Sequence, residues 1–261
     1  MKSVRDIARE FMGRGGKKLR PRLCRIVREA LLAEGAGEGR TGDFGQVLEA
    51  VECFHKASLI HDDIQDGDEE RYGMPSVHAE HGIPLAIAVG DWLVAEGYRL
   101  LATSGFPRAA DMLAAASESH LQLSEGQGDE QAIRFSELRC ATEDETLSIY
   151  RRKTGEAFAL AARLGAIAAL GPGERSQCVE RELVRFGLAF GVLFQMRDDA
   201  ADGETALAPS HREAAWAECA DAASAIDIPT LSSALAAFSE ALARNGGLAS
   251  QSGIASTADL L

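Results

Sequence analysis

Apolar residues recur every three or four positions along most of the chain, and this spacing places them on one face of an α-helix. Stretches rich in glycine and polar residues separate the periodic segments and mark their ends. We predict longer helices on this basis at residues 21–33, 44–66, 85–103, 108–127, 142–170 and 174–202. Two or three weaker helices follow from residue 203, before a Gly- and Ser-rich tail that starts at residue 245.

The segments that interrupt the helical pattern are predicted to be loops. Residues 35–45 are glycine-rich and charged, and residues 67–84 are polar and carry two prolines. A loop as long as the second is often functional in a compact domain. The sequence shows no strand pattern, fixed-period repeat or dividing linker, so we predict one all-α domain over residues 1–261.

Composition narrows the class of protein. Of the 261 residues, 46% are hydrophobic, which is too many for a disordered chain. The formal net charge of −13 argues against a nucleic-acid binder or a basic membrane-surface protein, because both need positive charge facing phosphates. No apolar run approaches the roughly 18 residues of a membrane span, so we expect no stable membrane insertion. Five dispersed cysteines without a C-x-x-C pair, and an N-terminus without a signal-peptide stretch, favour the cytoplasm.

The strongest chemical feature is a pair of acidic clusters with the same D-D-x-x-D spacing, each at the C-terminal end of a predicted apolar helix. The first cluster is Asp62, Asp63 and Asp66, and the second is Asp198, Asp199 and Asp202. Carboxylates four residues apart share a helix face, where they repel each other and the negative end of the helix dipole. Two such clusters indicate a compensating cation, and oxygen-only ligands favour Mg²⁺.

Three other interpretations of the first cluster are weaker. A single acidic run is often a solvated helix end, but a second copy with the same spacing disfavours that explanation. An EF-hand needs a different order of ligands. A metal-dependent phosphohydrolase that uses His55, His61 and Asp62 would leave the second cluster unexplained.

Cationic residues near these clusters are candidates to bind phosphate. Lys17, Lys18 and Arg20 lie on a glycine-hinged segment that leads into a helix, which suits an anion cradle. Lys153 lies in a mainly apolar helix, where it either snorkels to water or faces a polar cavity. Together with Arg71, which follows the first cluster, these residues indicate a diphosphate that Mg²⁺ holds and cations grip.

Seven short motifs follow one another along the chain. They are G-G-K-x-x-R-P at 15–21, H-K-A-S-L-I-H-D-D-x-x-D at 55–66, G-M-P-S-V-H at 73–78, V-G-D at 89–91, G-Q at 126–127, K-T at 153–154 and F-Q-x-x-D-D-x-x-D at 194–202. In this order they resemble the trans-type polyprenyl diphosphate synthase family. The resemblance spans about residues 13–202, and the C-terminal part diverges.

The resemblance implies an isoprenoid-synthase helical barrel around a deep apolar cavity. In this family an allylic diphosphate binds between the two acidic clusters through three Mg²⁺ ions and ionises. Isopentenyl diphosphate then attacks the allylic cation to give an all-trans prenyl diphosphate. A dry cavity protects the cation, while charges stabilise the leaving diphosphate. The family usually forms homodimers.

The resemblance also implies a role for each motif residue. The six clustered aspartates serve the metals, with Asp199 either a ligand or a support. Lys17, Arg20 and His55 match the isopentenyl diphosphate site. The residues that match the allylic site are Arg71, Lys153, Thr154 and Gln195, of which Arg71, Lys153 and Gln195 are the catalytic candidates.

Three departures from the family pattern leave alternatives open. Tyr72 stands where the family usually has a second arginine that grips isopentenyl diphosphate. Residues 203–208 lack the usual lysine, and Arg212 is the nearest cation. The leading helix is expected to be short or absent. The alternatives are a same-fold enzyme with another acceptor or a cyclase activity, and a weakly active partner subunit of a full-length synthase.

The helix face before the first cluster is expected to set the product length. Ala57 and Ser58 are small and would not stop a growing chain. Phe54, one turn earlier than Ser58, is either the floor of the cavity or ordinary core packing. We expect a product of about farnesyl to geranylgeranyl length.

Overall fold

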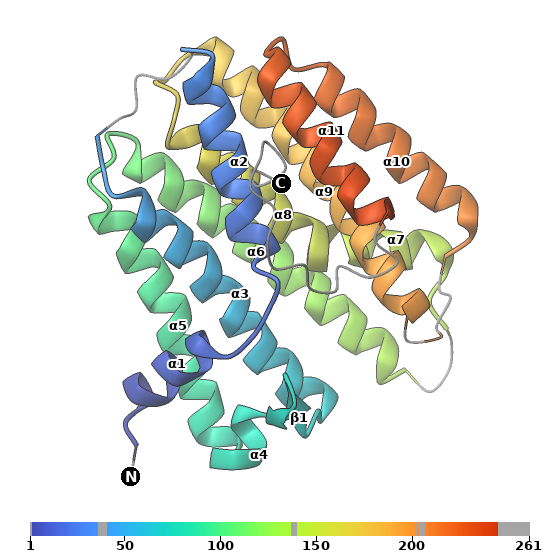
Figure 1. Cartoon of the computed structure of the whole chain (residues 1–261). Coiled ribbons are helices and arrows are strands. Elements are labelled where there is room, and N and C mark those ends of the chain that lie inside the picture. The colour runs from blue at the N-terminus through green and yellow to red at the C-terminus, as the bar shows by residue number, and fades with distance from the viewer. Residues whose placement is uncertain (1, 36–40, 137–139, 202, 204–206, 245–261) are drawn as a thin grey trace. The chain divides into compact units, whose positions relative to one another are not determined.

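The computed structural model describes residues 2–35, 41–136, 140–201, 203 and 207–244, and these are mostly helical (Figure 1). The helices are α1 (Val4–Gly13), α2 (Leu19–Ala33), α3 (Phe44–Asp66), α4 (Val77–His81), α5 (Ile83–Thr103), α6 (Ala109–Arg134), α7 (Glu143–Tyr150), α8 (Glu156–Ile167), α9 (Glu174–Ala201), α10 (Pro209–Ser224) and α11 (Pro229–Arg244). A π-helical turn, η1 (Arg151–Gly155), joins α7 to α8. Within the described ranges, the strands are the antiparallel pair β1 (Glu70–Arg71) and β2 (Met74–Pro75). The predicted all-α class is confirmed.

The apolar periodicity predicted most helices to within a few residues. The bounds of α3 are those predicted, and α6 continues past its predicted end to Arg134. The helix predicted at 142–170 is interrupted by η1. The sequence did not show this interruption, because a five-residue π-turn leaves the apolar spacing almost unchanged. The two helices α10 and α11 confirm the weaker helices predicted after residue 203. The predicted tail from residue 245 lies outside the described residues.

The prediction of one long loop at 67–84 was wrong in part. Tyr72 and Gly73 have φ angles of 59° and 71°, and they form a two-residue turn between β1 and β2. Strands of two residues are too short to show an alternating pattern, which is why the hairpin was missed. The Ser76 hydroxyl accepts from the Ala79 N–H at 3.3 Å and begins α4.

The leading helix is present but short. Ser3 and Asp6 form a capping box at the start of α1, in which each side chain accepts from the backbone N–H of the other residue. Ile7, Ala8 and Phe11 form its buried face. The cap and the narrow apolar face explain how ten residues make a stable helix here.

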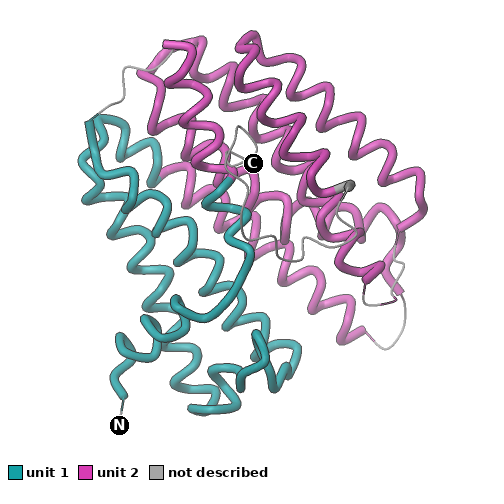
Figure 2. Tube along the Cα trace, viewed as in Figure 1, with its two compact units in different colours: residues 1–22, 41–113 teal, residues 23–40, 114–261 magenta. Residues whose placement is uncertain are grey.

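The chain groups into two compact units, shown in different colours in Figure 2. Unit 1 consists of residues 1–22 and 41–113, and unit 2 consists of residues 23–40 and 114–261. The single domain expected over residues 1–261 remains a prediction. In the part of the chain that the structure describes, no helix has both the length and the apolar character needed to cross a membrane.

Unit 1 is built on the close packing of α3 against α5. A Cβ atom added at Gly97 would lie 2.3 Å from Cε1 of Phe54, and one added at Gly90 would lie 2.2 Å from Nε2 of His61. Neither distance is compatible with a real side chain, so these two glycines let large α3 side chains lie directly on the α5 backbone.

Unit 2 is built on the close packing of α8 against α9. A Cβ atom added at Gly187 would lie 2.4 Å from Cα of Ala159, and one added at Gly191 would lie 2.3 Å from Cα of Gly155. The two backbones therefore touch. Next to this contact, the rings of Phe158 and Phe190 meet edge to face, with centroids 4.9 Å apart.

We predict that Gly187→Ala lowers the free energy of unfolding by about 1–3 kcal/mol or more, because the added methyl group meets the backbone of α8. Gly128→Ala is the matched control, since a Cβ atom there meets nothing within 4 Å. The control should raise stability by up to about 1 kcal/mol, the helix propensity difference. Urea denaturation measures both changes, and equal stability of the two variants would contradict the proposed backbone contact.

Candidate active site

The first acidic cluster ends α3, where its three carboxylates have different surroundings. Asp62 and Asp66 are half-buried, whereas Asp63 is only 1% exposed. Gly67, with a φ of 74°, ends the helix directly after Asp66. The cluster therefore presents two carboxylates partly to solvent and directs the middle one inward.

Arg71 holds the inward carboxylate. Its Nε donates to Asp63 Oδ1 at 2.8 Å, and its Nη2 contacts the same oxygen and also donates to Asp68 Oδ2 at 3.1 Å. Burial raises the pKa of Asp63, and the charge of Arg71 opposes this rise. Arg71 is thus shared between two carboxylates, and Asp63 Oδ2 is buried with no hydrogen-bond partner among the described residues.

The cationic segment between α1 and α2 leads into a contact between two of the predicted site residues. Arg20 Nη1, at the start of α2, lies 3.3 Å from Nε2 of His55 on α3, while Lys17 is exposed on the segment that precedes α2. Burial, assisted by the charge of Arg20, holds the pKa of His55 well below its ordinary value. His55 is therefore neutral at pH 7, and its Nε2 can accept a hydrogen bond from Arg20.

Lys56 is a residue that the sequence analysis missed. It is completely buried, and its Nζ donates at 2.7 Å to the carbonyls of both Arg14 and Gly15. Lysine is seldom buried to this extent. The available signal was the position of Glu52 and Lys56, four residues apart inside an otherwise apolar helix face.

The second acidic cluster ends α9, and its middle carboxylate is also held by the protein. Gln195 Nε2 donates to Asp199 Oδ1 at 2.8 Å, and the Tyr150 hydroxyl donates to Asp199 Oδ2. Asp198 accepts from Arg197 Nη2 at 2.8 Å. Asp202, the third predicted metal ligand of this cluster, lies outside the described residues. Tyr150 was not predicted as a site residue.

The turn η1 carries the predicted Lys153 and Thr154. The Thr154 hydroxyl donates to Gln195 Oε1 at 2.9 Å, so this threonine joins the network around Asp199. Lys153 contacts Glu130 of α6 instead. A Cβ atom added at Gly126 of α6 would lie 3.0 Å from the backbone nitrogen of Lys153, which shows how closely α6 approaches this turn. Isolated π-turns occur frequently at functional sites.

Several predicted residues are thus brought together, as two pairs in unit 1 and one trio in unit 2. Unit 1 joins Asp63 to Arg71 and His55 to Arg20, and unit 2 joins Thr154, Gln195 and Asp199. Within the described ranges, no three His, Cys, Asp or Glu side chains are set around a common metal position. The partly exposed carboxylates of Asp62, Asp66 and Asp198 nevertheless fit magnesium in their chemistry, since this ion is bound by few carboxylates together with water and phosphate oxygens.

The residues predicted to set product length have different surroundings. Phe54 is 7% exposed and packs edge to face on Tyr98, with centroids 5.2 Å apart. Ala57 is buried, whereas Ser58 is exposed and donates to the His55 carbonyl at 2.8 Å. The packing of Phe54 matches the core interpretation, and its role as the floor of a cavity stays a prediction.

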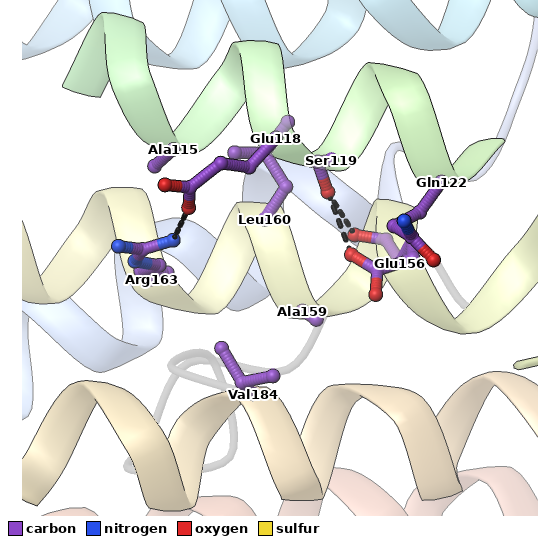
Figure 3. Close-up of a pocket in the computed structure, with 9 residues that line it drawn as sticks. All are labelled: Ala115, Glu118, Ser119, Gln122, Glu156, Ala159, Leu160, Arg163 and Val184. Atoms are coloured by element: carbon purple, nitrogen blue, oxygen red, sulfur yellow. Dashed lines mark hydrogen bonds and ion pairs between the residues drawn. The ribbon is translucent and has the colours of Figure 1, made fainter. Parts of the chain in front are cut away.

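Unit 2 also contains a pocket of about 180 Å³ beside α6, α8 and α9 (Figure 3). Across it, Ser119 donates to Glu156 Oε2 at 2.9 Å, and Arg163 Nη1 donates to Glu118 Oε2 at 2.8 Å. None of the predicted site residues lines this pocket. Charged and apolar side chains line it together, so it is not the deep apolar cavity expected from the resemblance, which stays a prediction.

Comparison with known proteins gives consistent matches. The polyprenyl synthetase family model matches residues 1–208. A short chain isoprenyl diphosphate synthase of Methanothermobacter thermautotrophicus is 35% identical over 209 residues, which are 77% of this chain and 61% of the relative. A geranylgeranyl pyrophosphate synthase of Geoglobus acetivorans is 33% identical over 198 residues, which are 75% of this chain and 58% of the relative. The chain therefore matches about three fifths of the length of these relatives.

The fold is similar to that of a geranyltransferase from Helicobacter pylori, solved in complex with magnesium and isoprenyl diphosphate. The TM-score is 0.74 at 20% sequence identity, and the match covers 94% of this chain and 91% of that one. At this identity the likeness supports the fold alone. It agrees with the predicted isoprenoid-synthase class.

We predict that Tyr150 and Asp199 are energetically coupled. In a double-mutant cycle of Tyr150→Phe and Asp199→Ala, the coupling energy should be about 1 kcal/mol. Either single substitution already removes the hydrogen bond to the charged carboxylate, so the second substitution costs less in the double variant. The same cycle with Asp198→Ala is the control and should be additive, since Asp198 accepts from Arg197. Urea denaturation supplies the four free energies of each cycle. Additivity in the Asp199 cycle would disprove the contact.

Proposed function

Because the chain belongs to the polyprenyl synthetase family, we propose that it is a magnesium-dependent prenyltransferase that joins an allylic diphosphate to isopentenyl diphosphate. The observation that carries this proposal is the pair of acidic helix ends, each with its middle carboxylate already held by the protein. The product would be an all-trans prenyl diphosphate of about farnesyl to geranylgeranyl length, in line with the names of the relatives. We also propose a cytoplasmic homodimer of single-domain subunits.

The metal ions, expected to be three, would be held by the outward carboxylates. These are Asp62, Asp66 and Asp198, with Asp202 included from the sequence alone. Bound magnesium would neutralise the diphosphate and so make it a better leaving group. Asp63 and Asp199 would act as supports, because Asp63 is buried with one oxygen held by Arg71, and Gln195 and Tyr150 occupy both oxygens of Asp199.

The neighbouring polar residues would bind the two diphosphates. Arg71 and Lys153 are charge partners for the allylic diphosphate, and Lys153 must exchange its Glu130 partner for substrate to act in this way. Gln195 and Thr154 would orient that site through their hydrogen bond. Arg20, Lys17 and His55 would bind isopentenyl diphosphate, and neutral His55 would orient Arg20 by accepting a hydrogen bond from it.

We predict that the protein, with Mg²⁺ and isopentenyl diphosphate, elongates dimethylallyl, geranyl or farnesyl diphosphate, and that mass spectrometry detects the products. Chelation of the metal should abolish elongation. Asp62→Asn should lower kcat about a hundredfold or more. The neutral amide would hold Mg²⁺ less tightly, and the charge of Mg²⁺ is what would stabilise the leaving diphosphate in the transition state. Asp111→Asn, on the surface of α6, is the matched control and should keep wild-type activity.

Two outcomes of this assay would contradict the proposal. Diphosphate release without elongation would favour the cyclase or a different acceptor. A complete absence of turnover would favour the partner-subunit alternative.

We predict that Phe54→Ala shifts the product distribution towards longer chains if Phe54 is the floor, because the removed ring opens space beside Gly97. Val51→Ala, nearly one turn earlier on α3, removes buried volume from the same helix and is the control. The control should leave product length unchanged. An active Phe54→Ala variant with an unaltered mass distribution would assign Phe54 to core packing.

A further inference from the structure

The segment between α1 and α2 (residues 14–18) is held by the side chain of Lys56, which is completely buried. Lys56 Nζ donates to the carbonyls of Arg14 and Gly15, both at 2.7 Å. Burial lowers the pKa of Lys56, while the nearby carboxylate of Glu52 opposes this shift. The ammonium group therefore replaces its hydration shell with backbone carbonyls, and it holds the segment at two consecutive residues.

Aromatic rings complete the surroundings of this ammonium group. Lys56 Nζ lies 4.3 Å from the ring centroid of Tyr72 and 5.3 Å from that of Phe11. Both distances are within the range of a cation–π interaction, which is strongest where the cation is desolvated. Lys56 is thus held by two carbonyls and by rings from α1 and from the β1–β2 turn.

The backbone at Tyr72 is unusual for a large residue. Its φ of 59° is in the left-handed region, which costs about 1–3 kcal/mol for most side chains and persists only where the surroundings fix it. Here the left-handed turn is part of the hairpin whose tip places the ring over Lys56. The strained backbone of Tyr72 therefore accompanies the placement of its ring over Lys56.

The same ring covers the glycine pair of the segment. A Cβ atom added at Gly16 would lie 3.1 Å from the Tyr72 hydroxyl oxygen, and one added at Gly15 would lie 3.4 Å from the Tyr72 ring. Gly16 itself has a φ of 118°. The segment is thus held between the ring and the ammonium group just before Lys17, with Arg20 following at the start of α2.

We propose that Tyr72 and Lys56 are a positioning pair, which fixes Gly15 and Gly16 and so presents Lys17 and Arg20 to isopentenyl diphosphate. The proposal rests on the proposed function. Tyr72 does not replace the family's second arginine as a phosphate ligand; it acts on binding through the segment. Its neighbour Arg71 holds Asp63, so one hairpin tip supports both the first acidic cluster and the cationic segment.

The test compares Tyr72→Leu, Tyr72→Phe and Lys56→Met with the wild type. Tyr72→Leu and Lys56→Met should raise the KM for isopentenyl diphosphate about tenfold, while kcat and the KM of the allylic substrate change less than about twofold. Tyr72→Phe keeps the ring and should restore wild-type values. Met74→Ala, at an exposed position of the same hairpin, is the matched control and should behave as the wild type.

Two measurements do not depend on turnover. Hydrogen–deuterium exchange of residues 13–20 should be faster in Tyr72→Leu than in the wild type, with exchange in residues 44–51 unchanged. Calorimetric titration should show about tenfold weaker binding of isopentenyl diphosphate. If Lys56→Met does not fold, Tyr72→Leu alone decides the question.

Distinct results separate the failure of this inference from the failure of the proposed function. A wild type that makes no prenyl product refutes the proposed function, and a wild type that also fails to bind isopentenyl diphosphate in the calorimeter refutes the inference. If the wild type is active, unchanged binding in Tyr72→Leu overturns the inference. A parallel change in kcat and both KM values would do the same, because it would indicate a general structural role.

Discussion

Three ionisable side chains are buried on α3, Glu52, Lys56 and Asp63, and the irregular parts of unit 1 are arranged around the last two. Asp63 is paired with Arg71 from the hairpin, and Lys56 is paired with backbone carbonyls from the segment after α1. Removing the partner of a buried charge costs about 3–5 kcal/mol. The hairpin and the segment are the least regular parts of unit 1. They are therefore held in place by the buried charges, which the hairpin pairs with Arg71 and the segment with its backbone carbonyls.

Unit 2 depends on a different constraint, the absence of side chains where two helices touch. Gly155 of η1 lies against Gly191 of α9, and Gly187 lies against Ala159. Because the backbones meet, the short side chain of Thr154 reaches Gln195 directly. A larger separation of these elements would place the Thr154 hydroxyl out of hydrogen-bond range of the amide, and the network around Asp199 would lose one of its members.

The sequence predicted features that repeat or that have a fixed spacing. The bounds of α3 and the presence of α5, α6 and α9 follow from apolar periodicity, and the two acidic clusters follow from their spacing at helix ends. The partners of Lys56 could not be predicted, because backbone carbonyls are the same for every residue type. Tyr72 was interpreted only as a missing arginine, since nothing in the sequence indicates that a bulky residue adopts a left-handed turn.

The division of roles within each D-D-x-x-D motif could be predicted only in part: the resemblance gave Asp199 as a ligand or a support, but made no such distinction in the first cluster, because its three carboxylates are chemically identical. The structure gives them different surroundings: Asp63 is buried and paired with Arg71, Asp199 is half-buried and accepts from Gln195 and Tyr150, and half-buried Asp198 accepts from Arg197. A held carboxylate stiffens the helix end beside it, which lowers the entropy lost when its neighbour binds a cation. Within the described ranges, no three such groups surround one point, so a cation bound to one helix end alone would keep most of its water. On the proposed function, diphosphate oxygens would supply further ligands, and metal and substrate would then stabilise each other's binding.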